Sequence, residues 1–262
     1  MQERHKNRQL YFEEQAQTTQ KYVIPYINDI LEISPSTKVL EIGCGEGGNL
    51  KPFLDLGCQV VGIDLNKQQI ENAKKFFANH PNFSNLQLID QDIYQVQPSD
   101  ELKFDLIIMR DAIEHIPNQP IFIDFLKNFM HNSTRIFFAF PPWRMPFGGH
   151  QQICNSKFLS KLPYFHILPK FLYKFFLKIF GENKQTIDDL MDIKLTRISI
   201  QRFLSIIKSN KMEIEKKTYY LINPNYQTKF GLKPQKLYNF LNIPYLRDFY
   251  TTAMYCVVKQ KN

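Results

Sequence analysis

The sequence is short of the residues that indicate a disulfide scaffold, a cysteine-based metal site or a membrane-spanning segment. Its 262 residues contain one tryptophan and four scattered cysteines (Cys44, Cys58, Cys154 and Cys256), with no C-x-x-C pair. They predict neither disulfides nor a zinc site, and no metal-binding residues are expected. No apolar run reaches the length of about 18 residues that a transmembrane helix needs. The charged N-terminus lacks the apolar stretch of a signal peptide, so a cytoplasmic location is expected.

Phenylalanine, tyrosine and unevenly placed positive charge are abundant instead. Hydrophobic residues make up 44% and charged residues 22% of the chain, which excludes a disordered or fibrous protein. Phenylalanine occurs 23 times and tyrosine 13 times. Residues 1–150 have 14 basic and 18 acidic residues, whereas residues 151–262 have 19 and 7. The basic half suits an anionic partner (nucleic acid, a lipid headgroup or an acidic metabolite) or a solvated lysine-rich surface.

Apolar strands alternate with helices through the first half of the chain. The expected strands are residues 38–43, 59–64, 86–90, 104–109 and 135–140, and the expected helices start at Asn49 or cover 67–78 and 119–130. Strands that are apolar throughout and alternate with helices indicate a parallel sheet covered by helices on both faces.

The segments that flank this core have other patterns. Residues 8–32 predict helix, which Pro25 should break or kink into two short helices. After the proline- and glycine-rich loop 141–151, a helical stretch extends to about Ile193. Ser199 then caps a helix over 200–209, and strands over 212–222 and 249–259 should form an antiparallel pair at one sheet edge. The predicted units are an N-terminal helical segment (1–35), a ligand-binding core (36–150), a helical cap inserted after the fifth strand (151–198) and the C-terminal part of the core sheet (199–262).

A glycine-rich turn after the first strand carries the functional signal. Residues 43–48 read Gly-Cys-Gly-Glu-Gly-Gly, and glycines at a strand-to-helix turn let the backbone approach a ligand closely. Dinucleotide-binding proteins share this G-x-G-x-x-G pattern, which is weak evidence alone. Glu41 places a carboxylate near the turn, where it would repel a pyrophosphate and favour a cationic ligand. A sulfonium cofactor therefore fits better than a nicotinamide dinucleotide.

Four motifs in order resemble those of the class I S-adenosylmethionine-dependent methyltransferases. VLEIGCGEGGNL (39–50), VVGIDLN (60–66), IDQDIYQ (89–95) and FDLIIMRDAIEHI (104–116) are similar to the family's first to fourth motifs. The resemblance implies a doubly wound, Rossmann-like α/β fold with a mostly parallel sheet of about seven strands and an antiparallel C-terminal edge. It also implies S-adenosylmethionine as cofactor, with Asp64 on the ribose hydroxyls and Asp92 and Ile93 at the adenine. The residues expected to bind the cofactor are Glu41, Gly43, Cys44, Gly45, Gly47, Asp64, Leu65, Asp92, Ile93 and Arg110.

Two histidines are the catalytic candidates. His115 follows the fourth strand and acts either as a base or as a residue that orders the loop. His150 follows two glycines in the loop 141–152, where it is a base, a hydrogen-bond donor to the substrate, or a loop-ordering residue. A base is needed only if the attacking atom of the acceptor carries a proton at neutral pH.

The segment 168–180 favours a lipophilic small-molecule acceptor. Its three lysines, Lys170, Lys174 and Lys178, form one narrow stripe, and large apolar residues cover the remaining surface. So apolar a helix belongs in a lid or core, or in a membrane interface with its lysines extended toward the headgroups. Both alternatives indicate an aromatic, isoprenoid or lipid acceptor.

Three other functions remain open from the sequence. An RNA or protein methyltransferase could dock through the basic half, but FPPW (140–143) follows the fifth strand, not the fourth where amino methyltransferases of nucleic acids place such a tetrad. No RNA-binding module is evident either, so a nucleic-acid partner is not expected. A nicotinamide-dependent oxidoreductase conflicts with Glu41 and the late strand pair. A catalytically inactive S-adenosylmethionine binder is also compatible, and the oligomeric state is not predicted.

Overall fold

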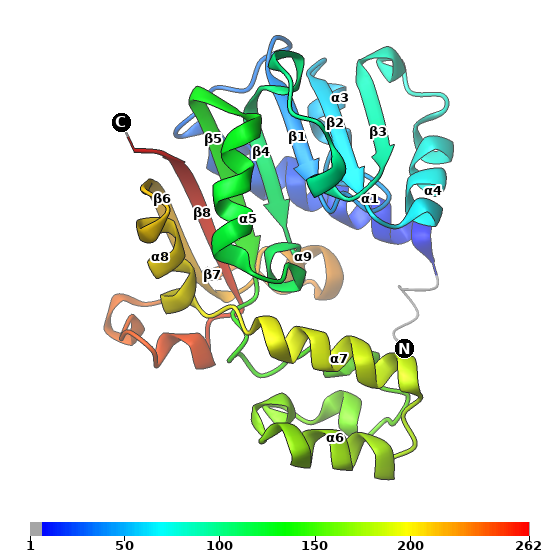
Figure 1. Cartoon of the computed structure of the whole chain (residues 1–262), viewed down its shortest axis with the longest axis vertical. Coiled ribbons are helices and arrows are strands. Elements are labelled where there is room, and N and C mark those ends of the chain that lie inside the picture. The colour runs from blue at the N-terminus through cyan, green and yellow to red at the C-terminus, as the bar shows by residue number, and fades with distance from the viewer. Residues whose placement is uncertain (1–6, 262) are drawn as a thin grey trace.

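The computed structural model describes residues 7–261, so residues 1–6 of the predicted N-terminal segment and residue 262 lie outside the described residues. One eight-stranded sheet runs through it in the order β3-β2-β1-β4-β5-β8-β6-β7 (Figure 1). The strands are β1 (Lys38–Ile42), β2 (Gln59–Asp64), β3 (Leu86–Asp90), β4 (Phe104–Arg110), β5 (Met130–Phe140), β6 (Met212–Ile222), β7 (Gln235–Lys236) and β8 (Ala253–Gln260).

The sheet is parallel from β3 to β5 and antiparallel beyond. β8 lies between β5 and β6 and pairs antiparallel with both. This arrangement confirms the predicted fold class and its antiparallel C-terminal edge. The sheet has eight strands where about seven were expected, because the two-residue β7 is too short to leave a periodic signal in the sequence.

Alternate strand residues pack toward opposite faces of the sheet. In β1, Val39 belongs to a cluster that includes Phe53 and Phe77, whereas Leu40 belongs to one that includes Phe122 and Phe203. The first face is covered by α1 (Arg8–Thr18), α2 (Ile24–Asn28), α3 (Lys51–Asp55) and α4 (Lys67–Phe77), and the second by α5 (Gln119–Leu126) and α8 (Ile200–Ser209). Helices on both faces leave the carboxyl edge of the parallel strands as the open side of the core.

The predicted interruption of the N-terminal helix takes the form of a π-helical segment. α1 continues through Thr19–Val23 into α2, and the N–H of Ile24 donates to the carbonyl of Thr19. Pro25 stands in the first turn of α2, where its missing N–H is tolerated. The chain therefore changes its hydrogen-bond register at this point without separating into two helices.

The segment between β5 and α8 forms a small core of its own. α6 (Lys170–Ile179) and α7 (Lys184–Thr196) lie beyond the carboxyl ends of the parallel strands (Figure 1). Tyr173 and Leu177 of α6 pack with Leu190 of α7 in a cluster separate from the two that cover the sheet. Within the described part of the chain, no helix has the length and apolar character needed to cross a membrane.

Several element boundaries differ from the expected ones for local reasons. The third helix begins at Lys51 and not Asn49, whose side chain bonds Glu41. The last strand begins at Ala253 because Arg247–Phe249 form a 3-10 turn. The short helix α9 (Asn225–Phe230) was not expected. Single 3-10 turns also occur at Phe83–Asn85, Ile93–Gln95, Asp100–Leu102, Ile113–His115, Lys127–Phe129, Gln151–Ile153, Leu159–Lys161, Phe165–Ile167 and Asn239–Leu241.

Candidate active site

A cavity of about 630 Å³ opens at the carboxyl ends of β1, β2 and β4. Its volume lies within the range of small-molecule and cofactor sites, and this edge of a doubly wound sheet is where such ligands bind. The predicted cofactor residues that line the cavity are Gly43, Cys44, Gly45, Asp64, Leu65, Asp92, Ile93 and Arg110. The structure thus brings together eight of the ten, and leaves Glu41 and Gly47 off the cavity wall.

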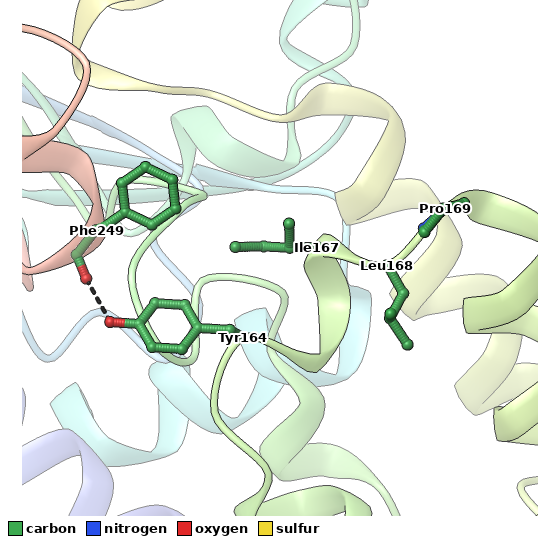
Figure 2. Close-up of a pocket in the computed structure, with 5 residues that line it drawn as sticks. All are labelled: Tyr164, Ile167, Leu168, Pro169 and Phe249. Atoms are coloured by element: carbon green, nitrogen blue, oxygen red, sulfur yellow. Dashed lines mark hydrogen bonds between the residues drawn. The ribbon is translucent and has the colours of Figure 1, made fainter.

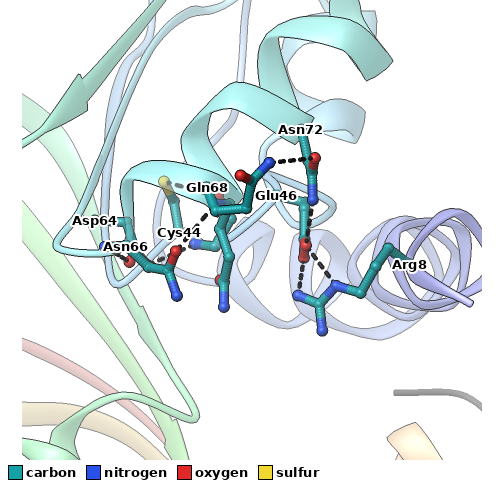
Figure 3. Close-up of polar contacts among 9 residues, drawn as sticks. Arg8, Cys44, Glu46, Asp64, Asn66, Gln68 and Asn72 are labelled. Carbon is teal, nitrogen blue, oxygen red and sulfur yellow. Dashed lines mark hydrogen bonds and ion pairs between the residues drawn. The ribbon is translucent and has the colours of Figure 1, made fainter. Parts of the chain in front are cut away.

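The glycine turn and Asp64 hold each other in place. The N–H of Gly45 donates to Oδ2 of Asp64 at 2.8 Å, and the N–H of Asn66 donates to Oδ1 at 2.8 Å (Figure 3). Gly45 has a φ of +55°, a region that side chains disfavour, so a glycine is needed at this point of the turn. Gly47 has a φ of +80°, and a Cβ there would also lie 2.8 Å from the ring of Phe77. Asp64 is therefore fixed at the end of β2 with its carboxylate at the cavity.

The residues after β3 form the next part of the wall. Oδ1 of Asp92 accepts from the N–H of Tyr94 at 3.0 Å, which starts the 3-10 turn that contains the buried Ile93. Cys44 is buried, and burial raises the pKa of its thiol well above the usual value, so it lines the cavity as an uncharged side chain. Leu65, by contrast, is exposed at the cavity rim.

Glu41 lies behind the cavity wall. It is fully buried, and its Oε1 accepts from Nδ2 of Asn49 at 2.6 Å. Burial raises the pKa of Glu41 to about 8, against the opposing effects of the Asn49 hydrogen bond and the Arg110 charge. The sequence places this carboxylate beside the ligand, whereas in the structure it acts on the cavity through its neighbours.

Arg110 connects the end of β4 to the N-terminal helix. Its Nη1 donates to Oδ1 of Asn49 at 2.6 Å and to Oγ1 of Thr19 at 3.0 Å, and the side chain is buried. Arg8 of α1 makes a further ion pair with the buried Glu46 of the glycine turn (Figure 3). Through these contacts α1 closes one side of the cavity.

Sequence reasoning missed the residues that α1 contributes to the cavity. Arg8, Tyr11 and Gln15 all line it. Burial raises the pKa of Tyr11 to about 12, so its hydroxyl keeps its proton at neutral pH. Helix α1 has little amphipathic pattern. The signal that the sequence offered was a basic residue, Arg8, that could pair with the acidic Glu46 of the glycine turn.

The two candidate histidines meet where the turn after β4 borders the cavity. His115 lines it, and the ring of His150 lies against that of His115 with centroids 5.1 Å apart in an edge-to-face arrangement. Burial, together with His115 and His166, lowers the pKa of His150 to about 3, and burial also lowers the pKa of His115. Both rings are therefore neutral at neutral pH. Between them the structure adds Glu114, which is buried and which the sequence analysis did not select.

The comparison with protein families decides the assignment. A family model described as a methyltransferase domain matches residues 12–160, which is more than half of the chain and includes the cavity wall except for Arg8 and Tyr11. The chain belongs to this methyltransferase family. The assignment confirms the predicted resemblance to class I S-adenosylmethionine-dependent methyltransferases, and with it S-adenosylmethionine as the cofactor of the family.

Relatives of this methyltransferase include two that bear the name ubiquinone biosynthesis O-methyltransferase. The protein of Glaesserella parasuis serovar 5 is 32% identical over 118 residues, covering 44% of this chain and 50% of the relative. That of Pelagibacter ubique is 35% identical over 103 residues, covering 39% and 41%. The chain thus matches half or less of the length of these curated relatives.

Solved structures of other methyltransferases share the fold over nearly the full chain. The plantazolicin methyltransferase BpumL, solved with a substrate analogue and S-adenosylhomocysteine, has a TM-score of 0.56 at 14% identity and covers 98% of this chain and 88% of its own. A putative sarcosine dimethylglycine methyltransferase from Galdieria sulphuraria has a TM-score of 0.60 at 13% identity and covers 93% and 85%. These likenesses establish the fold of the methyltransferase beyond the region that the family model matches.

The residues of the methyltransferase cavity fit an adenosyl cofactor. A ribose presents two neighbouring hydroxyls, which one carboxylate can accept from at once, and Asp64 stands at the end of β2 for that task. Asp92 and Ile93 offer an acceptor and an apolar contact to an adenine ring. Within the described residues, the two basic side chains that line the cavity, Arg8 and Arg110, are already bonded to Glu46 and Asn49, so the turn is poorly suited to a pyrophosphate.

Proposed function

We propose that this chain transfers a methyl group from S-adenosylmethionine to an oxygen of a small, lipophilic aromatic acceptor. The names of two curated relatives, ubiquinone biosynthesis O-methyltransferase, support transfer of the methyl group to an oxygen. The observation that carries the lipophilic character of the acceptor is the outward face of α6. A cytoplasmic location, with access to the membrane surface, is part of the proposal.

The outward face of α6 combines exposed apolar residues with lysines. Phe171, Phe175 and Ile179 are 71%, 55% and 62% exposed and recur every fourth residue. Lys170, Lys174 and Lys178 alternate with them on the same exposed side, while the buried Tyr173 and Leu177 anchor the helix to the cap core. A helix with exposed large apolar residues flanked by lysines suits a surface of anionic lipid headgroups. Of the two alternatives for 168–180, the exposure supports the membrane contact.

Beside α6, an open hollow extends the apolar surface. It has a volume of about 550 Å³ and is lined by Tyr164, Ile167, Leu168, Pro169 and Phe249 (Figure 2). The hydroxyl of Tyr164 donates to the carbonyl of Phe249 at 2.9 Å, which ties the cap to the turn before β8. Pro169 immediately precedes α6, so the hollow and the exposed face of the helix adjoin. This surface is suited to the tail of an acceptor that resides in a membrane.

The residues that line the site suggest a role for each part of it. The bound cofactor supplies an electrophilic methyl carbon. Asp64, Asp92 and the glycine turn hold and orient it, and α1 with Arg110 shields the cavity from water. His115 and His150 are the groups that handle the acceptor oxygen, because His115 lines the cavity and His150 packs against it from the loop that leads into the cap. This part of the site is the acceptor end.

The test uses radiolabelled S-adenosylmethionine and a prenylated dihydroxybenzene presented in vesicles of phosphatidylcholine and phosphatidylglycerol. We expect label in the lipid extract. Replacing Lys170, Lys174 and Lys178 together by Gln should weaken sedimentation with these vesicles about 100-fold at low salt, since each lysine contributes about 1 kcal/mol. The matched control replaces Lys208, Lys211 and Lys233, which are equally exposed but off α6, and should leave sedimentation within a few-fold of wild type.

Two results would contradict the proposal. Label transferred to RNA or protein but not to the lipophilic phenol would favour the alternative macromolecular substrate. Equal sedimentation of both triple variants would show that general charge, and not α6, attracts the vesicles.

A further inference from the structure

Three metal-ligating side chains converge at the acceptor end of the cavity. Glu114 and His115 belong to the 3-10 turn after β4, and His150 to the loop after β5. One carboxylate oxygen and one nitrogen of each imidazole all lie within 4.8 Å of one another. We propose that Glu114, His115 and His150 bind a divalent transition-metal ion whose open positions hold an oxygen of the acceptor. This inference rests on the proposed function and deepens it, because it assigns the acceptor end of the same site.

Glu114 provides the strongest argument for a cation. Its side chain is 4% exposed, and neither carboxylate oxygen has a hydrogen-bond partner within residues 7–261. The charged neighbour that acts on it is a second acid, Asp111. A carboxylate buried without a partner is costly, and a bound cation removes this cost. The Glu114 carboxyl group thus has no hydrogen-bond partner among the described residues, and one of its oxygens lies in the cluster.

The two histidines, like Glu114, lack hydrogen-bond partners for their side chains among the described residues. Within the described residues neither ring makes a hydrogen bond, and their main contact is the edge-to-face packing of one on the other. His115 also lines the cofactor cavity, so positions left open on an ion would face the space beside the cofactor. Two imidazoles and one carboxylate are a donor set that zinc, iron(II), manganese and cobalt accept, with room for further oxygen ligands.

The backbone around the cluster is held from outside. The hydroxyl of Thr196, at the end of α7, donates to the carbonyl of Glu114. Before His150, the N–H of Trp143 donates to the carbonyl of Ile198 at 2.8 Å, and Nε2 of His166 donates to the carbonyl of Trp143 at 2.6 Å. Donors bound to zinc lie about 3.3 Å apart, so side-chain rotations of roughly 1 Å close the set. Such outer contacts are what a metal site needs to keep its ligands oriented.

The sequence predicts no metal site, because its cysteines are scattered and do not stand at the short spacing of metal ligands. Glu114 and His150 stand far apart in the chain. The parallel pairing of β4 with β5 brings together the turns that follow these two strands, and with them the two residues.

The test measures cobalt binding directly. Protein freed of metal with a chelator is titrated with Co²⁺, whose visible absorption reports nitrogen and oxygen ligands in a four- or five-coordinate site. We expect one equivalent to bind, and Glu114→Gln, His115→Ala and His150→Ala each to weaken binding at least tenfold. His131→Ala is the matched control, since His131 pairs with Asp105 away from the cluster, and it should bind cobalt as wild type does.

The outcomes separate this inference from the proposed function. Calorimetric binding of S-adenosylhomocysteine by the same variants checks that they are folded. Cobalt binding that is absent from wild type, or unchanged in all three ligand variants, overturns the metal site while the methyltransferase proposal stands. Failure of wild type to bind S-adenosylhomocysteine overturns the proposed function itself.

Discussion

The two ends of the cavity are built by different kinds of contact. At the cofactor end, Asp64 is fixed by the N–H groups of Gly45 and Asn66, both at the carboxyl ends of neighbouring parallel strands. At the acceptor end, the pairing of β4 with β5 brings together the turns that carry His115 and His150, and α7, through Thr196, and the cap residue His166 hold these turns from outside. The cofactor end thus depends on the sheet alone, whereas the acceptor end depends both on the sheet and on how the cap packs on it.

This difference predicts that the two ends can be damaged separately. A parallel sheet with helices on both faces keeps its carboxyl edge as long as its core is intact. The cap, which has its own hydrophobic cluster, adds the acceptor end to that edge. Changes in the cap should therefore alter acceptor handling and local stability while the affinity for the cofactor persists.

The largest separation is expected from Gly149→Ala. A Cβ at Gly149 would lie 2.1 Å from Cβ of His166, and both positions are closely packed. Overpacking of this kind should lower the free energy of unfolding by about 3 kcal/mol. Trp143, the only tryptophan, lies in the same loop, so its fluorescence during urea unfolding reports on the acceptor end. S-adenosylhomocysteine affinity should stay within a few-fold.

Gly181→Ala is the control for Gly149→Ala. A Cβ at Gly181 meets nothing within 4 Å, but its φ of +74° disfavours a side chain, so a cost of only about 1 kcal/mol is expected. Loss of cofactor affinity in Gly149→Ala with the fold intact would show that the cap supports the cofactor end as well.

The next largest effect concerns Glu41 and alkaline pH. Its folded pKa of about 8 lies above the usual value of 4.5, so the stability it contributes is present below pH 4.5 and is lost as pH rises toward 8. Glu41→Gln keeps an acceptor for Asn49 and cannot ionise. We expect the free energy of unfolding of the variant, relative to that of wild type, to rise by on the order of 3 kcal/mol between pH 5 and pH 8, as measured by urea unfolding. A difference that does not change with pH would contradict the buried position of this carboxyl group.

The cofactor end could be predicted from sequence because its signals are local. The acid at the end of β2 and the glycine turn after β1 are read from the strand pattern, and parallel strands bring their carboxyl ends to one edge. Glu41 and Gly47 belong to the same sequence motif but do not line the cavity. Strand alternation buries Glu41, and Phe77 packs on Gly47. Motif membership therefore predicted the neighbourhood of these two residues and not their contacts.

At the acceptor end, His166 should show the opposite pH dependence. Burial lowers its pKa to about 4 from the usual 6.5, so its stabilising contribution is present above pH 6.5 and is lost as pH falls toward 4. His166→Gln preserves an N–H for the carbonyl of Trp143 and removes the titration. We expect the free energy of unfolding, followed by Trp143 fluorescence, to fall between pH 6.5 and pH 4. This fall should be smaller in the variant by on the order of 2 kcal/mol. Identical acid transitions would show that His166 does not govern the cap.

The acceptor end was only partly predictable. His115 and His150 were selected as single candidates from the residues around them, but their contact depends on the cap and has no periodic signal. Glu114 was not selected, because its burial depends on the tertiary contact of α7 with the turn and leaves no signal in the sequence. The aromatic helix 168–180 was found from its composition, whereas the direction of its exposed face depends on Tyr173 and Leu177 packing inward.

The most direct test of the account is calorimetric titration of the full chain with S-adenosylhomocysteine. We predict binding of one equivalent to wild type, and affinity about tenfold to hundredfold weaker for Asp64→Ala, the loss expected for a charge-assisted hydrogen bond of about 1.5–3 kcal/mol. Binding of NADH in place of S-adenosylhomocysteine, or equal S-adenosylhomocysteine affinity in wild type and Asp64→Ala, would contradict the assignment of this cavity.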